Sequence, residues 1–258
     1  MTLETRLTFS QRSQLCTNPT AKRLFQLMDA KKTNLAVSVD TTDAAHLLYL
    51  AELLGPEICV LKTHIDILSN FTPKVTDELV KIAEKHHFLL FEDRKFCDIG
   101  ATVRDQYREG IYRIADWSPI TNAHIIPGPG IIAGLREVGL PKGNGLLLVA
   151  EMSSVDNLAN GTYTEKAIEM AYEYSDFVIG FICQRKLTER PEYIHMTPGV
   201  NLHSKGDKLG QRYLTPEIAV GNNGSDVIIV GRGITESVNP LEEAKRYKSA
   251  GYHEVNYG

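Results

Sequence analysis

The chain has 258 residues, with 28 basic and 32 acidic side chains and a formal net charge of -4 at neutral pH. This slight acidic excess argues against nucleic acid or a membrane surface as the main partner, so an anionic ligand would have to be bound by a local group of cations. The first residues form no apolar signal core, no segment reaches the roughly eighteen apolar residues of a membrane helix, and we expect a cytosolic protein.

Short apolar segments of β-strand character recur eight times along the chain. Several are apolar at consecutive positions, which is typical of parallel strands that are covered on both faces. The predicted strands are residues 34–40, 57–64, 88–93, 120–126, 145–152, 177–182, 193–198 and 226–231. Helical spacing of apolar residues predicts helices at 41–54, 76–86, 102–112, 162–174 and 240–250.

This alternation of strands and helices predicts the fold class. Length alone allows one large barrel or two modest domains, but no segment has the composition of a linker. Eight strand-helix units in about 250 residues match the size of a (β/α)8 TIM barrel. We therefore predict a single α/β domain over residues 1–258, with a long loop at 199–213 after the seventh strand.

Charged residues follow the second and third predicted strands, at the barrel end where active sites lie. The apolar run at 88–91 leads through Glu92 into Asp93, Arg94 and Lys95, and Lys62 ends the preceding strand. Charges so close to a core need partners or a function. A fixed cation beside a fixed anion suits a reaction that moves negative charge between neighbouring substrate atoms. A salt-bridged strand rim is the alternative interpretation.

Glycine and arginine residues follow the last two strands. Arg232 lies between two glycines after the eighth strand, and Gln211 and Tyr213 follow Gly210 in the preceding loop. In such barrels these loops often bind phosphate, because backbone N–H groups near glycine approach the anion while arginine pairs with its oxygens. The pattern indicates a phosphate site, with an ordinary surface arginine as the alternative.

Other polar residues are less informative. Glu151 could act as an acid or base, or could brace Lys62 or the backbone. The four cysteines are far apart and form no set typical of a metal or redox site, so we predict no bound metal. Cys59 and Cys183 lie in apolar runs and are expected to be buried thiols.

Several motifs together resemble one family. FEDRKFCDIG at 91–100 is similar to FEDRKFADIG, the signature of the orotidine 5'-monophosphate decarboxylases, and LKTHIDIL, ITNAH, AEMSS, MTPGV, GDKLGQRY and DVIIVGRG resemble the family's other landmarks in the same order. The resemblance covers about residues 18–251. It implies a barrel that converts orotidine 5'-monophosphate to uridine 5'-monophosphate and carbon dioxide, the last step of de novo pyrimidine synthesis, without metal or organic cofactor.

The resemblance also implies catalytic roles. Asp93 would lie beside the substrate carboxylate, Lys95 would protonate C6 of the pyrimidine, and Lys62 would complete the charged array and contact the ribose. Asp98 and Thr102 would be contributed by the other subunit of a homodimer.

The same resemblance implies a set of substrate-binding residues. Asp40 would contact the ribose, while Ser153 and Pro198 would read the pyrimidine edge. The phosphate would be held by Gln211, Tyr213 and Arg232. Departures from the family pattern are Cys97 and Ala101 in the signature, Arg212 beside Gln211, and the C-terminal sequence GYHEVNYG.

Two other functions fit the residues. One is a metal-dependent phosphosugar aldolase or epimerase of the same barrel type, and the other is a nucleotide-binding barrel without catalysis. The decarboxylase could also be half of a bifunctional chain with an orotate phosphoribosyltransferase.

Overall fold

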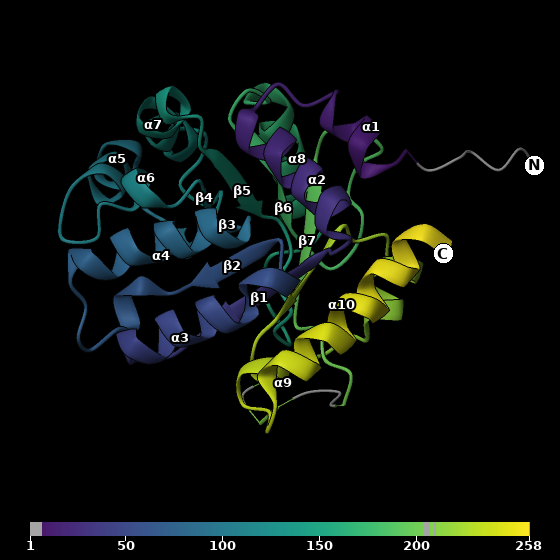
Figure 1. The fold of residues 1–258 in the computed structure, drawn as a ribbon. Helices are drawn as coiled ribbons and strands as arrows, with labels where there is room; N and C mark the ends of the chain where they lie inside the picture. The colour runs from purple at the N-terminus through teal and green to yellow at the C-terminus, as the bar shows by residue number, and fades with distance from the viewer. Residues whose placement is uncertain (1–6, 204–206, 209, 258) are drawn as a thin grey trace, which may run out of the picture.

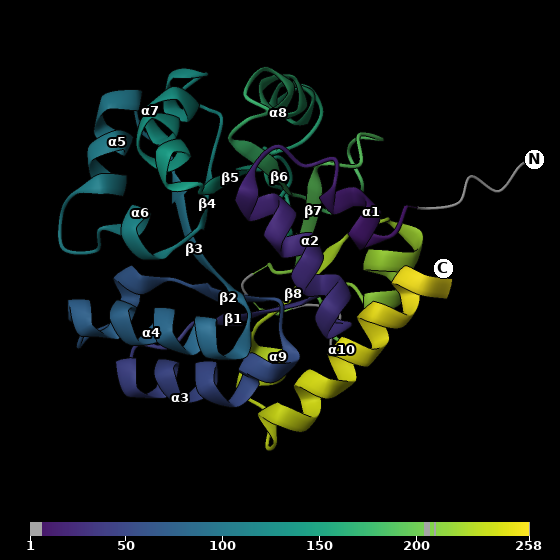
Figure 2. The same ribbon diagram turned by 45° about the horizontal axis from the view of Figure 1, so that its top comes forward.

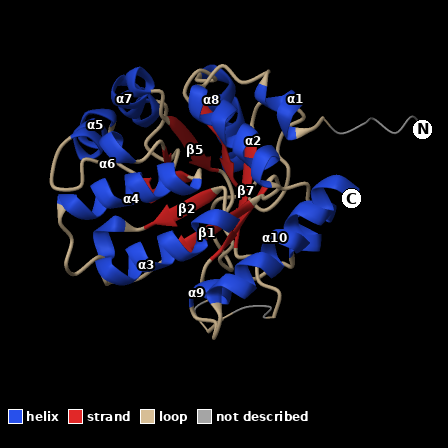
Figure 3. Ribbon diagram, in the orientation of Figure 1, coloured by secondary structure: helices blue, strands red, loops and turns tan. Residues whose placement is uncertain are grey.

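The computed structural model describes residues 7–203, 207–208 and 210–257. Its eight strands form a closed barrel in chain order, and every neighbouring pair is parallel. The helices surround the strands (Figures 1 and 3). The predicted (β/α)8 barrel is confirmed. The strands are β1 Leu35–Val39, β2 Val60–Thr63, β3 Leu89–Phe96, β4 Ile120–Ala123, β5 Gly145–Val149, β6 Val178–Ile182, β7 Ile194–Pro198 and β8 Val227–Val230.

Each predicted strand overlaps one observed strand, and β3 is the strand that extends beyond its predicted end. This strand runs to Phe96 rather than ending at residue 93. Asp93, Arg94 and Lys95 therefore belong to the strand itself. A charged triplet within a strand is held more rigidly than one in a loop, and this matters for the site below.

Four predicted helices are confirmed, whereas the one at 102–112 ends at Arg108 and a separate short helix follows at 114–117. Gly110 and Arg113 both have positive φ, 72° and 43°, which ends one helix before the next begins. Five of the helices in the described residues were not predicted. The helices are α1 Phe9–Ser13, α2 Pro19–Lys31, α3 Ala44–Leu54, α4 Pro73–His86, α5 Gly100–Arg108, α6 Ile114–Trp117, α7 Gly130–Gly139, α8 Thr162–Glu173, α9 Arg232–Thr235 and α10 Pro240–Tyr257. The unpredicted ones are α1, α2, α6, α7 and α9. No helix in the described ranges is both long and apolar enough to cross a membrane.

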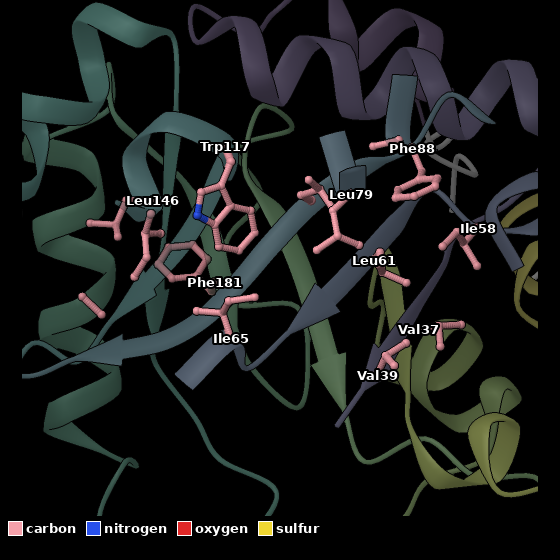
Figure 4. Packing of buried hydrophobic residues seen from close by; sticks show 14 of the residues in the cluster. Val37, Val39, Ile58, Leu61, Ile65, Leu79, Phe88, Trp117, Leu146 and Phe181 are labelled. Atoms are coloured by element: carbon pink, nitrogen blue, oxygen red, sulfur yellow. The ribbon is translucent and has the colours of Figure 1, made fainter. Parts of the chain in front are cut away.

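The strands separate two buried apolar layers, because successive side chains point to opposite faces. Val37 and Leu61 point outward and pack in one cluster with Leu79 of α4 and the neighbouring Phe88 (Figure 4). Figure 2 shows α3 and α4 side by side on the outside of the barrel. The inward-pointing residues fill the barrel and include Ala36, Phe91, Leu147, Val149, Met196 and Ile229.

The N-terminal segment closes one end of the barrel. Leu24, Phe25 and Met28 of α2 are fully buried in the same cluster as the inward-pointing strand residues. Arg12 fastens α1 beside them, since its guanidinium pairs with the buried Asp226 carboxylate and donates to the Tyr193 carbonyl at 2.9 Å. The barrel interior is therefore sealed by apolar side chains at the N-terminal ends of its strands.

The predicted loop at 199–213 follows β7. Residues 204–206 and 209 lie outside the described residues. The loop is tied down at both ends, by bridges between Val200 and Leu214 and between Ser154 and Gln211. Gly199 has φ 73°, and a side chain there would meet Gln211 and the Arg212 backbone, so the tight approach requires glycine.

Candidate active site

A cavity of about 480 Å³ opens at the C-terminal ends of the strands. The strands place inward-pointing side chains in its floor, and the loops after β7 and β8 form its wall. Nine of the eleven predicted site residues line it, namely Asp40, Lys62, Asp93, Lys95, Ser153, Pro198, Gln211, Tyr213 and Arg232. The two others, Asp98 and Thr102, do not line it.

Asp93 is the centre of a charged array in the floor of the cavity. Its Oδ2 lies 2.8 Å from Lys62 Nζ and its Oδ1 lies 2.6 Å from Lys95 Nζ. Asn122 Nδ2 donates a further hydrogen bond to Oδ1 at 2.6 Å. Burial by itself would raise the pKa of Asp93, but Lys62 and Lys95 hold that pKa well below its usual range. The carboxylate is therefore ionised between two ammonium groups.

Lys62 lies on the inner face of β2 and is buried. Burial alone would lower the pKa of its ammonium, but Asp93 and Asp40 raise it overall. Its Nζ lies 2.9 Å from His64 Nε2. Burial and the Lys62 charge lower the pKa of His64, so the imidazole is neutral and its Nε2 accepts from the ammonium.

The loops after β7 and β8 bring the predicted phosphate residues together. Arg232 Nη2 donates to the Tyr213 hydroxyl at 2.8 Å and also pairs with the Asp207 carboxylate. Gln211 Nε2 donates to Ser153 Oγ at 2.8 Å. This hydrogen bond links a residue predicted to bind phosphate with the serine predicted to contact the pyrimidine edge, and so connects the two ends of the cavity.

Asp98 and Thr102 lie outside the cavity of their own chain. Asp98 is exposed, and its Oδ1 accepts a hydrogen bond from the backbone N–H of Ile99 at 2.7 Å. Thr102 is half-buried on α5. Cys97, which departs from the family signature, is also exposed. A single chain therefore brings together only part of the predicted residue set.

Sequence reasoning assigned no role to two residues that contact the charged array, His64 and Asn122. The sequence carries a signal for both residues. His64 is two residues after Lys62, and Asn122 points inward from β4, the strand beside β3. Glu151 does not touch Lys62. Its carboxylate accepts hydrogen bonds from Gln184 N at 2.9 Å and Arg185 Nε at 3.1 Å, so it braces the backbone after β6.

No cysteine of the described residues lines the cavity. Cys59 and Cys183 are buried as expected, and burial raises the pKa of Cys59 to about 12. Within the part of the chain that the structure describes, no group of three or more His, Cys, Asp or Glu side chains could hold a metal ion.

Comparison with known proteins gives a consistent result. A family model described as orotidine 5'-phosphate decarboxylase / HUMPS family matches residues 33–247. The orotidine 5'-phosphate decarboxylase of Phycomyces blakesleeanus is 52% identical over 256 residues, which cover 98% of this chain and 96% of that protein. The uridine 5'-monophosphate synthase of Bos taurus is 52% identical over 247 residues, or 95% of this chain, which spans about half (52%) of that protein.

A solved structure shares the fold. The orotidine 5'-monophosphate decarboxylase of Methanocaldococcus jannaschii, complexed with the inhibitor BMP, superposes with a TM-score of 0.67. The match has 22% sequence identity and covers 84% of this chain and 98% of that chain. It agrees with the barrel described above.

Proposed function

This chain belongs to the orotidine 5'-phosphate decarboxylase / HUMPS family, and we propose that it decarboxylates orotidine 5'-monophosphate to uridine 5'-monophosphate and carbon dioxide in de novo pyrimidine synthesis. One observation carries the proposal beyond family membership. A buried carboxylate, Asp93, is held between the ammonium groups of Lys62 and Lys95 in the floor of a cavity whose far wall carries Arg232.

The reaction creates a charge that needs such an array. When the bond between C6 and the carboxylate breaks, the electron pair stays on C6 in an orbital within the ring plane, where the ring carbonyls cannot delocalise it. A fixed ammonium at Lys95 stabilises that pair electrostatically in a site shielded from water. Lys95 then transfers a proton to C6, carbon dioxide leaves, and the amine regains a proton from solvent.

Asp93 fits two tasks in this mechanism. Its carboxylate orients the Lys95 ammonium through the 2.6 Å contact. It would also face the substrate carboxylate, and two like charges in a buried site repel each other until one departs as neutral carbon dioxide. Lys62 keeps the array charged by pairing with the opposite oxygen of Asp93.

The remaining lining residues fit the rest of the nucleotide. Arg232, Tyr213 and Gln211 would bind the phosphate, Asp40 and Lys62 the ribose, and Ser153 with Pro198 the pyrimidine edge. Phosphate binding lies away from C6 but matters for turnover, because remote binding energy can drive ordering of loops and exclusion of water around the reacting atom. No step in this scheme requires a metal or an organic cofactor.

We further propose a homodimer in which Asp98 and Thr102 complete the partner's site. The support is the surface that carries them. Ile99 is 64% exposed after β3, and Ile126 is 73% exposed after the neighbouring β4. Exposed apolar side chains that gather in one patch mark an interaction surface. The start of α5 is rigidly placed, because Gly100 and Gly134 of α7 touch backbone to backbone.

The decisive assay adds orotidine 5'-monophosphate to the protein in the presence of EDTA and follows the ultraviolet absorbance of the pyrimidine. We expect the orotidylate spectrum to convert to that of uridylate. Activity that requires added metal and a phosphosugar would favour the aldolase or epimerase alternative. Binding of uridine 5'-monophosphate with no spectral change of orotidylate would identify a barrel without catalysis. Fractionation of cells would test our proposal that the enzyme is cytosolic.

A further inference from the structure

The ladder between β3 and β4 is interrupted at the charged array. Glu92 pairs with Thr121 and Phe96 pairs with Ala123, so the three residues of β3 between these pairs lie opposite a single residue of β4. Lys95 lies inside this interruption with φ 47°, a conformation uncommon for a residue with a side chain. A strained backbone at an array of charges has to be held by its surroundings.

Asn122 supplies the missing ladder contact with its side chain. Its Oδ1 accepts the hydrogen bond of the Lys95 backbone N–H at 2.7 Å, and its Nδ2 donates to Asp93 Oδ1 at 2.6 Å. The Lys95 ammonium returns to the same Asp93 oxygen at 2.6 Å. One amide therefore joins the backbone of the proposed proton donor to the carboxylate that orients its ammonium.

The environment of Asn122 favours a positioning role over substrate binding. Its side chain is fully buried and it is not among the residues that line the cavity. The two polar atoms of its amide have different roles, because Oδ1 can only accept a hydrogen bond and Nδ2 can only donate one. No other uncharged side chain of this size offers an acceptor to Lys95 N and a donor to Asp93 in the same plane.

We propose that Asn122 is a positioning residue that fixes Lys95 and Asp93 in their reactive arrangement. This inference rests on the proposed decarboxylation for its kinetic consequence, but its geometry can be tested without turnover. Loss of the amide frees the Lys95 backbone from its strained conformation, and the ammonium then loses its fixed place relative to C6. Substrate binding through the phosphate and ribose contacts is retained.

The first test compares Asn122→Ala with Asn144→Ala as a matched control. Asn144 is also buried, and its Nδ2 donates to the Tyr107 hydroxyl at 2.9 Å and the Ala115 carbonyl at 3.0 Å, away from the cavity. We expect Asn122→Ala to lower kcat by about 100-fold or more, as small misplacements of catalytic groups do, while KM and the affinity for uridine 5'-monophosphate change little. An unchanged kcat, or an equal loss in both variants, would overturn the proposal.

The second test uses Asn122→Asp, which keeps the shape of the side chain. A carboxyl group there can replace the amide only when protonated, because it must donate to Asp93 and accept from Lys95 N. Its kcat relative to the parent should therefore rise as the pH is lowered from about 8 to about 5.5. A ratio that is constant over this range would contradict the role.

The third test measures amide hydrogen exchange of Lys95 by mass spectrometry or NMR. We expect protection in the parent and in Asn144→Ala, and its loss in Asn122→Ala. This readout does not depend on activity, so failure of the proposed decarboxylation leaves it interpretable. Equal protection in parent and Asn122→Ala would show that Asn122 does not hold the backbone.

Discussion

Asp207 and Arg232 form an ion pair at the wall of the cavity, with the Tyr213 hydroxyl 2.8 Å from the same guanidinium nitrogen. A phosphate bound by Arg232 would have to replace this carboxylate. We predict that Asp207→Asn tightens binding of uridine 5'-monophosphate by about 3- to 10-fold, because a neutral amide competes less with the phosphate for Arg232. Isothermal titration calorimetry would measure the dissociation constant of the nucleotide for the parent and the variant.

The side-chain Oδ1 of Asp207 also accepts from Gln211 N at 3.1 Å, and asparagine retains this contact. Asp105→Asn, which removes an exposed carboxylate paired with Arg104 and Arg108 outside the cavity, is a suitable control. Weaker nucleotide binding in Asp207→Asn would show that the carboxylate supports the phosphate site instead of competing with it.

Removing Arg232 itself tests the phosphate assignment. We predict that Arg232→Ala lowers kcat/KM by about 100-fold or more, because a charge-assisted contact to the phosphate is lost, and leaves residual activity at high substrate concentration. As a control, Arg246→Ala removes an exposed guanidinium that pairs with Glu243 on the same helix, α10. We expect this variant to behave like the parent. Unchanged kinetics in Arg232→Ala would refute the assignment.

Mixing two inactive variants tests the shared site. Lys95→Ala removes the proton donor and Asp98→Ala removes the residue proposed to cross the dimer, so each homodimer should be inactive. In a heterodimer one site recovers both groups, and random subunit exchange should restore about one quarter of the parent activity. Steady-state rates after mixing, with subunit exchange verified by mass spectrometry, would measure it. Complete absence of activity despite exchange would indicate self-contained sites.

Much of this arrangement could be predicted because it depends on strand periodicity. Alternation of apolar runs and helices identified the barrel, and the ends of its second and third strands placed Lys62 and Asp93 where active sites lie. The position of Asn122 against Lys95 could not be predicted, since it depends on an interrupted register that has no signature in either strand alone. The pairing of Asp207 with Arg232 could not be predicted either, because it joins two loops that are apart in the sequence.

The missed helix α2 shows a different limit. Its start carries a recognisable signal, because Asn18 accepts hydrogen bonds from Thr20 N and Ala21 N and Pro19 occupies the first turn. It precedes the first strand, however, and the strand-helix alternation gives no reason to expect a helix there. Its role of closing the barrel follows only from the packed structure.

Glu92 should make stability depend on pH. It lies behind the site, where Thr63 Oγ1 donates to it at 2.7 Å and Ile65 N at 3.0 Å, and burial raises the pKa of its carboxyl to about 8. The carboxyl has a pKa of about 4.5 in the unfolded state and about 8 in the folded state. Between these pH values the folded state therefore keeps a proton that the unfolded state has lost. The stabilisation is present below about pH 4.5 and is lost as the pH rises through about 8.

Glu92→Gln removes the titrating group and should flatten this dependence. We predict that the free energy of unfolding of the parent falls relative to the variant between about pH 5 and 8, by at most about 1.4 kcal/mol per pH unit. Urea unfolding at several pH values would measure it, with Glu78→Gln on the surface of α4 as the control. A constant difference between parent and Glu92→Gln would mean that Glu92 does not titrate in this range.

Lys31 should be a major contributor to stability, because it holds the ends of several elements together. Its ammonium donates to the carbonyls of Gly55 at 2.8 Å, Ile58 at 2.6 Å and His86 at 2.8 Å, which lie at the ends of α3 and α4 and before β2. Helix C-termini favour a cation, and these carbonyls have few other donors.

We predict that Lys31→Met lowers the free energy of unfolding by about 2 kcal/mol or more, since partly buried carbonyls lose their donor. Lys81→Met is the matched control, because Lys81 is exposed on α4 and its one ion pair, with Glu78, is also exposed. Its effect should stay within about 0.5 kcal/mol. Chemical denaturation would measure both, and equal stability of the two variants would show that water satisfies the carbonyls when the ammonium is removed.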